Sequence, residues 1–384
     1  MKIISVVGAR PNFMKVAPFI KAIKTYNDTL GDGTIEHLLV HTGQHYDVRM
    51  SESFFEALQI PNPDINLNIG SGSHAEQVGH TMIAFEKVCL EHKPDWVIVI
   101  GDVNATLACS VTAKKLHIKV CHIEAGLRSG DIEMPEEINR LVTDRLSDLL
   151  LIPDRLSEKN LLREGANKDS IVMVGNIMID TLDANQDKAG ALSLDGVIAD
   201  NKHEACIQSI SLKDDNYTVL TMHRPSNVDD PKILEEIVDF IINDIATIMP
   251  VVWTVHPRTE KQLKNFGLWD NIINCTTIQL LYPLGYHEML RLNQGAKIML
   301  TDSGGLQEEC TVLGTRCLTM RWNTERPVTL KENGGASILV GNDVERMRHE
   351  FEVILKENTI SLRPEMWDGK TAMRCVKAIV AASE

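Results

Sequence analysis

Short runs of Val, Ile and Leu recur along this chain, and segments with helical spacing of apolar residues separate them. In the first half the runs cover residues 3–7, 38–41, 96–100, 120–123, 149–152 and 171–174. Between the runs, apolar residues recur every three or four positions, which indicates amphipathic helices. Strands that are apolar on both faces are typical of parallel sheets covered by helices on both sides. The pattern therefore predicts an α/β fold built from doubly wound parallel sheets.

The alternation weakens once, between about residues 187 and 212, where polar residues dominate. A second series of apolar runs covers residues 219–222, 251–255, 272–275, 297–300, 317–320 and 338–340. With 384 residues, the chain is long enough for two domains of ordinary size. We therefore expect a first domain at residues 1–186, a linker region at 187–212 and a second domain at 213–365.

The charge and cysteine content exclude several classes of protein. The chain has 39 Lys and Arg against 53 Asp and Glu, a net charge of −14, which argues against nucleic-acid binding but leaves a small anion in a local basic pocket possible. The eight cysteines form no CxxC pair, which favours buried free thiols over disulfides or zinc. No apolar run approaches the roughly 18 residues of a membrane span, and Arg10 and Pro11 interrupt the first run before a signal peptide could form. We expect a soluble, cytoplasmic protein without a membrane partner.

The residues that follow the predicted strands are unusually polar. They include residues 8–11, 42–45, 101–102, 124–128, 223–225 and 301–305. Ligands of doubly wound sheets bind beyond the carboxyl ends of the strands. This clustering is the main functional signal in the sequence.

The first strand leads into the segment GARPNFMK. Arg10 lies just beyond the strand, Pro11 suits the first turn of a helix, and Lys15 lies about one turn further on. Both cations can face one ligand, and the pair suits a diphosphate. A surface Arg and Lys on an ordinary turn is an equally open alternative. The segment is not a dinucleotide-binding fingerprint, because GxGxxG is absent.

The segment TDSGGLQEE lies between a predicted strand and a predicted helix. Gly304 and Gly305 let backbone N–H groups approach an anion at the start of that helix. A tight turn in which Ser303 only caps the helix is the alternative. Glu309 lies further along the same helix, where its carboxylate could accept hydrogen bonds from ribose hydroxyls.

Three acidic residues are candidates for acid and base chemistry. Asp102 and Glu124 each follow a predicted strand and emerge at the same edge of one sheet, which makes a shared carboxylate site reasonable. Glu136 follows a Met-Pro pair where a helix should begin. As an alternative to a role in catalysis, Glu136 and its neighbour Glu137 can simply stabilise the first turn of that helix through its dipole.

His223 ends the first predicted strand of the second domain and can face the first domain across a ligand. A lone histidine is more often structural. The other strand-end histidines show no metal-ligand spacing; they are His41, His45, His122 and His256. We therefore expect no metal site and no redox cofactor.

Several of these segments occur together in a known family. In chain order they are GARPNFMK, TGQH, GDVNATLA, HIEAGLRSGD, MPEEINR, VGNIMIDTL, MHRPSN, LTDSGGLQEE and MRWNTERP. From Met1 to about residue 380, the chain resembles the non-hydrolysing UDP-N-acetylglucosamine 2-epimerases. The resemblance implies two Rossmann-like domains that face a central cleft, the arrangement called the GT-B fold. It also implies a C-terminal helix at about 366–384 that packs back on the first domain, and a homodimer.

The resemblance also implies a role for each matching residue. Arg10, Lys15 and Gln44 would bind the substrate, the first two through its diphosphate. Asp102, Glu124 and Glu136 would serve the sugar ring, and His223 would assist the leaving UDP. The residues implied to hold the nucleotide are Ser303, Gly304, Gly305, Glu309 and Arg326.

Three departures from the family pattern leave the sugar open. Ala9 stands where Thr is common, Val103 to Ala105 stand where a Thr run is frequent, and the stretch between Asp131 and Glu136 is short. Relatives in this family act on UDP-2,3-diacetamido-glucuronic acid, so that sugar is an alternative to UDP-N-acetylglucosamine.

The chemistry of the sugar favours an elimination. No carbonyl adjoins C2 of a pyranose to acidify its hydrogen, and no NAD fingerprint supports an oxidation route. Loss of UDP from C1 as a carboxylate removes the C2 proton gives a 2-acetamidoglucal, to which UDP can add back. A GT-B glycosyltransferase and a catalytically silent sugar-nucleotide sensor are the alternatives. The three carboxylates argue against both.

Overall fold

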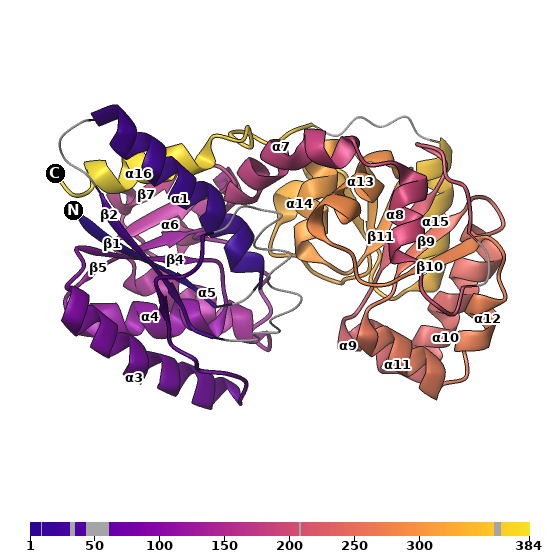
Figure 1. Cartoon of the computed structure of the whole chain (residues 1–384), viewed down its shortest axis with the longest axis horizontal. Coiled ribbons are helices and arrows are strands. Elements are labelled where there is room, and N and C mark those ends of the chain that lie inside the picture. Colours follow the sequence, from indigo (N-terminus) through magenta and orange to yellow (C-terminus); the bar gives the residue numbers. More distant parts are fainter. Residues whose placement is uncertain (9, 31–34, 44–60, 207–208, 357–361) are drawn as a thin grey trace. The chain divides into compact units, whose positions relative to one another are not determined.

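Thirteen strands in the part of the chain described by the computed structural model form two parallel sheets, one in each of two units. The described residues are 1–384 except 9, 31–34, 44–60, 207–208 and 357–361. Unit 1 comprises Met1–Ala184 and Glu365–Glu384, and unit 2 comprises Asn185–Pro364. Helices alternate with strands along both (Figure 1). The predicted α/β fold class with doubly wound sheets is confirmed.

The sheet of unit 1 has the strand order β3-β2-β1-β4-β5-β6-β7. Its strands are β1 (Lys2–Val7), β2 (Glu36–His41), β3 (Ile65–Asn66), β4 (Trp96–Ile100), β5 (Lys119–Ile123), β6 (Leu149–Ile152) and β7 (Ile171–Met173). The chain fills the sheet in one direction to β3 and then in the other from β4. This reversal between β1 and β4 is the position where doubly wound sheets bind ligands.

The helices of unit 1 cover both faces of this sheet. They are α1 (Arg10–Leu30), α3 (His74–His92), α4 (Asn104–Lys115), α5 (Pro135–Leu146), α6 (Arg155–Arg163), α7 (Ile177–Gly190, which continues into unit 2) and α16 (Thr371–Ala381), with a 3₁₀ turn at Lys168–Ser170. α1 and α16 lie side by side, and α3 and α4 pack together on the other face (Figure 1). Sequence signals fix several helix starts, including a capping box at Ser73 and Pro135 in the first turn of α5.

The sheet of unit 2 has the order β10-β9-β8-β11-β12-β13. Its strands are β8 (Thr218–Thr221), β9 (Val251–Thr254), β10 (Ile278–Leu281), β11 (Ile298–Thr301), β12 (Arg316–Thr319) and β13 (Ser337–Leu339). The order reverses between β8 and β11, so the residues that follow these two strands occupy the second ligand-binding position.

The helices of unit 2 follow its strands. They are α8 (Leu194–Asn201), α9 (Pro225–Val228), α10 (Pro231–Phe240), α11 (Pro257–Asn265), α12 (Trp269–Ile273), α13 (Tyr286–Gly295), α14 (Gly304–Leu313) and α15 (Val344–Lys356); a π-helical turn, Ile241–Ile245, extends α10, and 3₁₀ turns lie at Pro327–Thr329 and Lys331–Asn333. Helix α8 lies inside the segment 187–212 that the sequence indicates as a linker. Ser193 caps it, and Leu194, Val197 and Ile198 are buried, so this part of the segment packs as a helix.

One strand prediction is wrong. The run 272–275 is not a strand, because Ile272 and Ile273 end helix α12 and the strand β10 begins only at Ile278. A four-residue apolar run does not distinguish a strand from a buried helical turn. The neighbouring run of Ile278 to Leu281 provides the strand.

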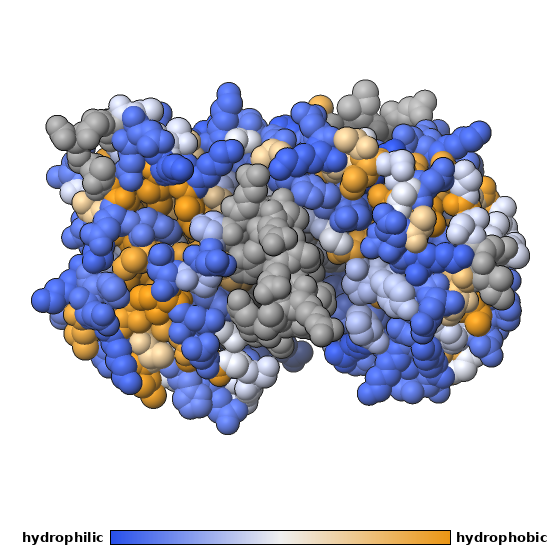
Figure 2. Space-filling model, in the orientation of Figure 1, coloured by the Kyte–Doolittle hydropathy of each residue, from blue (hydrophilic) through white to orange (hydrophobic). Residues whose placement is uncertain are grey.

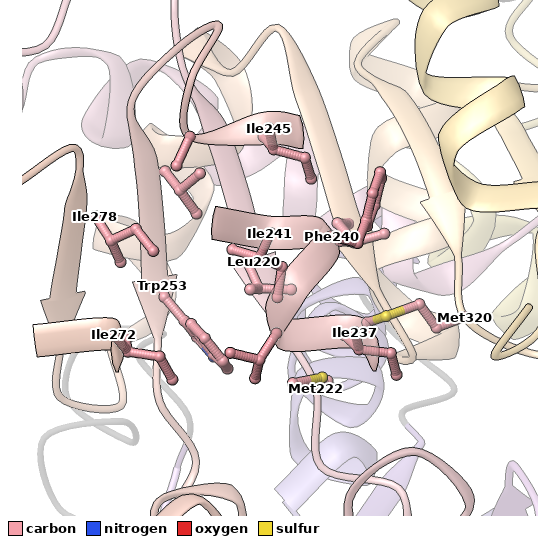
Figure 3. Close-up of a cluster of buried hydrophobic side chains, with 14 of the residues drawn as sticks. Leu220, Met222, Ile237, Phe240, Ile241, Ile245, Trp253, Ile272, Ile278 and Met320 are labelled. Carbon is pink, nitrogen blue, oxygen red and sulfur yellow. The ribbon is translucent and has the colours of Figure 1, made fainter. Parts of the chain in front are cut away.

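Large apolar side chains fill the core of unit 2 on one side of its sheet. Trp253 and Leu220, from two adjacent strands, pack with Ile237, Phe240 and other side chains from α10 (Figure 3). All eight cysteines are free, and seven of them are buried. Buried free thiols of this kind pack as small apolar groups.

Two surface features of the described residues bear on partners. No described helix is both long enough and apolar enough to cross a membrane. On the face drawn in Figure 2, apolar residues gather mainly over unit 1. Ile83 and Leu90 of α3 are among the exposed large apolar side chains, with exposed fractions of 61% and 59%.

Candidate active site

A buried ion pair joins α1 to the end of β5 in unit 1. The Lys15 Nζ lies 2.5 Å from a carboxylate oxygen of Glu124, and the two residues are only 6% and 4% exposed. Glu124 has a left-handed backbone, with φ of 73°, which a residue with a side chain rarely adopts without compensation. Its N–H donates to the Leu151 carbonyl at 3.0 Å. The turn after β5 is therefore held in a strained form that presents the carboxylate to Lys15.

Asp102 lies at the same edge of the sheet, after β4. Ile100 and Ile123, the last residues of β4 and β5, are register partners. Nε and Nη2 of Arg140 donate to one Asp102 carboxylate oxygen at 3.0 and 2.7 Å, and Asn139 Nδ2 donates to the Asp102 carbonyl at 2.9 Å. Helix α5 thus fixes both the backbone and the side chain of Asp102.

Glu136 and Glu137 have different surroundings at the start of α5. Glu137 is buried, and it accepts hydrogen bonds from the N–H groups of Ser129 and Gly130, both at 3.0 Å. It therefore ties the preceding loop to the helix and pairs with Arg140. Glu136 is half-buried in the first turn. Of the two adjacent acids, Glu137 is committed to structure, which leaves Glu136 as the candidate for chemistry.

A buried carboxylate organises the edge of the sheet in unit 2. Asp302, directly after β11, accepts from the N–H groups of His223 and Arg224, both at 2.8 Å, and lies 3.0 Å from Nδ1 of His223. Burial alone would raise the pKa of Asp302, but its hydrogen bonds with His223 and Arg224 outweigh burial and lower this pKa. The His223 side chain is 45% exposed. Asp302 therefore orients His223 while leaving its ring accessible.

The two glycines at the start of α14 have different surroundings. A Cβ on Gly304 would lie 2.9 Å from Arg326 Nη1, whereas a Cβ on Gly305 would have no protein atom within 4 Å. Ser303 is the N-cap residue of this helix, which has no side-chain cap hydrogen bond. Free N–H groups at a helix start and open space beside Gly305 suit an anion such as a phosphate.

Glu309 and Arg326 are both buried beside further carboxylates. Burial, together with the neighbouring charge of Glu308, raises the pKa of Glu309 to about 7. Arg326 Nε lies 2.6 Å from a Glu308 oxygen, and Arg326 also pairs with Glu325. Arg326 is therefore held by acidic side chains at the position where the resemblance implies contact with a nucleotide.

The structure thus brings the predicted residues together in two groups, one per unit. Lys15 and Glu124 pair at the end of β5, next to the end of β4 that Asp102 follows, and Glu136 lies in the first turn of α5. His223 and the start of α14 lie at the ends of β8 and β11. Gln44 lies outside the described residues, as does the side chain of Arg10.

Sequence reasoning missed the residues that hold the site in place. Arg140 and Asp302 are the principal ones. Arg140 belongs to MPEEINR and Asp302 to LTDSGGLQEE, so both were inside segments already singled out. Arg140 pairs with Asp102, 38 positions away, and Asp302 with His223, 79 positions away. No local sequence pattern indicates contacts between residues so far apart.

Comparisons with known proteins agree on one family. The family model described as UDP-N-acetylglucosamine 2-epimerase matches residues 29–380. The UDP-N-acetylglucosamine 2-epimerase of Methanocaldococcus jannaschii is 40% identical, over 99% of both chains. The UDP-2,3-diacetamido-2,3-dideoxy-D-glucuronate 2-epimerase of Pseudomonas aeruginosa is also 40% identical, over 89% of this chain and 88% of the relative. The crystal structure of the M. jannaschii enzyme in complex with UDP-GlcNAc and UDP superposes with a TM-score of 0.85, covering 99% of this chain and all of that one.

Proposed function

Because the chain belongs to the UDP-N-acetylglucosamine 2-epimerase family and is therefore an isomerase, we propose that it interconverts UDP-N-acetylglucosamine and UDP-N-acetylmannosamine. Membership favours an epimerase over the glycosyltransferase and the silent sensor that the sequence left as alternatives. The observation that carries the proposal is the pair of carboxylates, Asp102 and Glu124, fixed at the ends of two paired strands. Inversion of C2 requires proton transfer on both faces of the sugar, which two separate groups can perform.

The reaction that fits these groups is an elimination followed by re-addition. One carboxylate removes the C2 proton while the C1–O bond breaks and its electron pair leaves with UDP. The product is a 2-acetamidoglucal. A second acidic group then protonates C2 on the opposite face, and UDP re-forms the C1–O bond. Asp102, Glu124 and Glu136 are the candidates for these transfers.

The basic and nucleotide-binding residues supply charge stabilisation. The Lys15 ammonium carries three N–H donors, so it can hold Glu124 and still donate to a diphosphate. Arg10 would share this contact, and His223, oriented by Asp302, would assist the leaving UDP. Ser303, Gly304, Gly305, Glu309 and Arg326 would hold the nucleotide. Such fixed donors stabilise the charge that develops on the leaving oxygen.

The substrate is tested by following two sugar nucleotides separately by proton NMR. With UDP-N-acetylglucosamine, we expect signals of the C2 epimer to grow until they reach a constant ratio. The same assay with UDP-2,3-diacetamido-glucuronic acid tests the second candidate, which the Pseudomonas aeruginosa relative supports at equal identity. If only UDP-2,3-diacetamido-glucuronic acid is converted, that sugar nucleotide is the substrate and UDP-N-acetylglucosamine is not. If neither is converted, the proposed epimerase activity is contradicted.

We also propose that the protein acts in the cytoplasm as a homodimer. The exposed Ile83 and Leu90 of α3 are apolar surface of the kind that subunit association buries. Light scattering of the purified protein measures its mass directly. A mass of one chain at micromolar concentration would contradict the dimer.

A further inference from the structure

His122 lies in β5, directly before the last residue of the strand, and is fully buried. Its Nε2 lies 2.9 Å from the carbonyl oxygen of Gly101, and its Nδ1 lies 2.6 Å from a carboxylate oxygen of Asp144. A carbonyl oxygen can only accept a hydrogen bond, so Nε2 must carry a proton. The state of the ring therefore depends on whether Nδ1 carries a proton as well.

The surroundings of Asp144 keep that carboxyl ionised. Its second oxygen accepts from the Gly126 N–H at 3.0 Å and lies 2.7 Å from Nη1 of Arg128. Both contacts favour the ionised carboxylate whatever the state of His122, because a guanidinium and an N–H can only donate. An ionised carboxylate has no proton to donate. Nδ1 must then be the donor, which makes His122 an imidazolium.

The balance of charge around Arg128 agrees with this protonation state. Arg128 is buried and also binds Glu164, which lies at the surface, through Nη2 at 2.6 Å. Without the extra proton on His122, one guanidinium would face two carboxylates. With it, the cluster of His122, Arg128, Asp144 and Glu164 has two charges of each sign. Buried charges are tolerated when they are paired in this way.

The hydrogen bonds of His122 reach both turns that carry the catalytic candidates, one directly at Gly101 and the other through Asp144 of α5. Gly101 directly precedes Asp102, and Gly126, held by Asp144, follows Glu124 by two residues. Gly101, Glu124 and Gly126 all have positive φ, of 72°, 73° and 83°. Glycine adopts this conformation readily, whereas Glu124 has a side chain and keeps it only where surrounding contacts hold it. The pair His122 and Asp144 therefore connects the turn after β4 with the strained turn at Glu124.

We propose that His122 is a positioning residue, an imidazolium that donates from both ring nitrogens, which fixes the turns after β4 and β5 so that Asp102 and Glu124 keep the geometry required for proton transfer. The kinetic part of this inference rests on the function proposed above, whereas the protonation state does not. Misplacement of a reacting group by about 1 Å can lower a rate by roughly 10².

The protonation state is tested on the wild-type protein with ¹⁵N-labelled histidine at pH 7.5. Long-range ¹H–¹⁵N correlation spectra distinguish a ring with two protonated nitrogens from a ring with one. We expect one solvent-protected imidazolium, which disappears in His122→Gln. His37 is an internal reference for a neutral ring, because burial lowers its pKa to about 4. A wild-type spectrum in which every protected ring has a single protonated nitrogen would overturn the proposal.

The positioning role is tested with two substitutions that each keep one hydrogen bond. The amide of His122→Gln can reach the position of Nε2 and donate to Gly101, whereas the amide of His122→Asn can reach only the position of Nδ1, towards Asp144. We expect kcat to fall by roughly 10² in His122→Asn, which loses the hydrogen bond to Gly101, the residue next to Asp102. In His122→Gln, which keeps this bond, we expect kcat to fall only about tenfold. UDP affinity should change far less than kcat, since Ser303, Gly304, Gly305, Glu309 and Arg326 belong to unit 2 and only the proposed diphosphate contacts of Arg10 and Lys15 belong to unit 1.

The matched control is His37→Gln, in the same sheet. His37 lies near the start of β2, away from the carboxyl ends of the strands, and bonds Ser5 at 2.9 Å. We expect this variant to keep its kcat. Equal loss of kcat in His122→Gln and His122→Asn, or loss of kcat only in step with UDP affinity and melting temperature, would show a general structural role and overturn the proposal. A wild-type protein without epimerase activity would contradict the proposed function alone, because the spectra would still decide the state of His122.

Discussion

The carboxylates of unit 1 are held by different cations in different environments. Glu124 is buried against the ammonium of Lys15, while the Asp102 side chain is 26% exposed and held by the guanidinium of Arg140. Different surroundings allow two chemically similar groups to take different parts in one reaction. The geometry therefore supports a division of labour between these carboxylates rather than a redundant pair.

Replacing each carboxylate by its amide should separate catalysis from binding. Asp102→Asn, Glu124→Gln and Glu136→Gln keep the side-chain size but cannot transfer the proton, so we expect turnover to fall by roughly 10² or more in each. Binding of UDP, measured by calorimetry, should persist. Glu133→Gln is the control, because Glu133 is an exposed carboxylate in the turn just before α5. Normal turnover in the three variants would contradict their assignment.

Glu124→Gln should also lower stability, unlike Glu136→Gln. The substitution leaves the Lys15 ammonium buried without its counter-charge, and breaking a buried pair typically costs about 3–5 kcal/mol. Urea unfolding of the variants measures this loss. A Glu124→Gln variant as stable as Glu136→Gln would show that Lys15 and Glu124 do not form this ion pair in solution.

Glu309 predicts a pH dependence of stability. Its pKa is raised from the ordinary 4.5 to about 7, so the folded protein holds this proton where the unfolded chain has lost it. The contribution of Glu309 to stability is therefore present below about pH 4.5 and is lost as the pH rises towards 7. Between pH 5 and pH 8, the melting temperature of the wild type should fall relative to that of Glu309→Gln. Parallel curves for the two proteins would contradict the raised pKa.

At the scale of elements, the start of α14 connects packing to ligand binding. Gly305→Ala introduces a methyl group that meets no protein atom within 4 Å, and Ala favours a helix by roughly 0.5–1 kcal/mol over Gly. We expect unchanged or slightly higher stability but at least tenfold weaker UDP binding, because the methyl group occupies space that the proposal gives to phosphate. Unchanged UDP affinity would remove this glycine from the site.

The strands and the segments that follow them are predictable from sequence, because buried parallel strands are apolar on both faces and their polar ends stand out. The run 272–275 fails this test because a short buried helical turn has the same composition. The candidate residues lie in these segments, but no sequence pattern identifies the groups that orient them. Arg140 reaches Asp102, and Asp302 reaches His223, only because the fold brings distant segments together.

At the scale of the molecule, the C-terminal segment completes unit 1. Asp180 in α7 accepts from the N–H groups of Thr371 and Ala372 at 3.1 and 2.8 Å and so caps α16. Trp96 Nε1 donates to Ser383 Oγ at 2.8 Å. Residues nearly 200 or more positions apart are thus joined at both ends of α16, which is consistent with its place in unit 1.

Removal of this cap should destabilise the protein without touching the candidate site. We expect Asp180→Ala to lower the free energy of unfolding by about 1–2 kcal/mol, because two helix N–H groups lose their acceptor. Asp195→Ala, at an exposed position of α8, serves as the control in urea unfolding. Equal stability of the two variants would show that Asp180 does not hold α16.

The elimination itself is tested most directly by the fate of the C2 hydrogen. The purified protein is incubated with UDP-N-acetylglucosamine in deuterated water, with EDTA present and no NAD added, and the products are followed by proton NMR. We predict that UDP-N-acetylmannosamine forms with deuterium at C2, because the second acidic group, which protonates the opposite face, carries a deuteron taken from the solvent. An epimer that retains its original hydrogen at C2, or a strict requirement for metal or NAD, would contradict the mechanism.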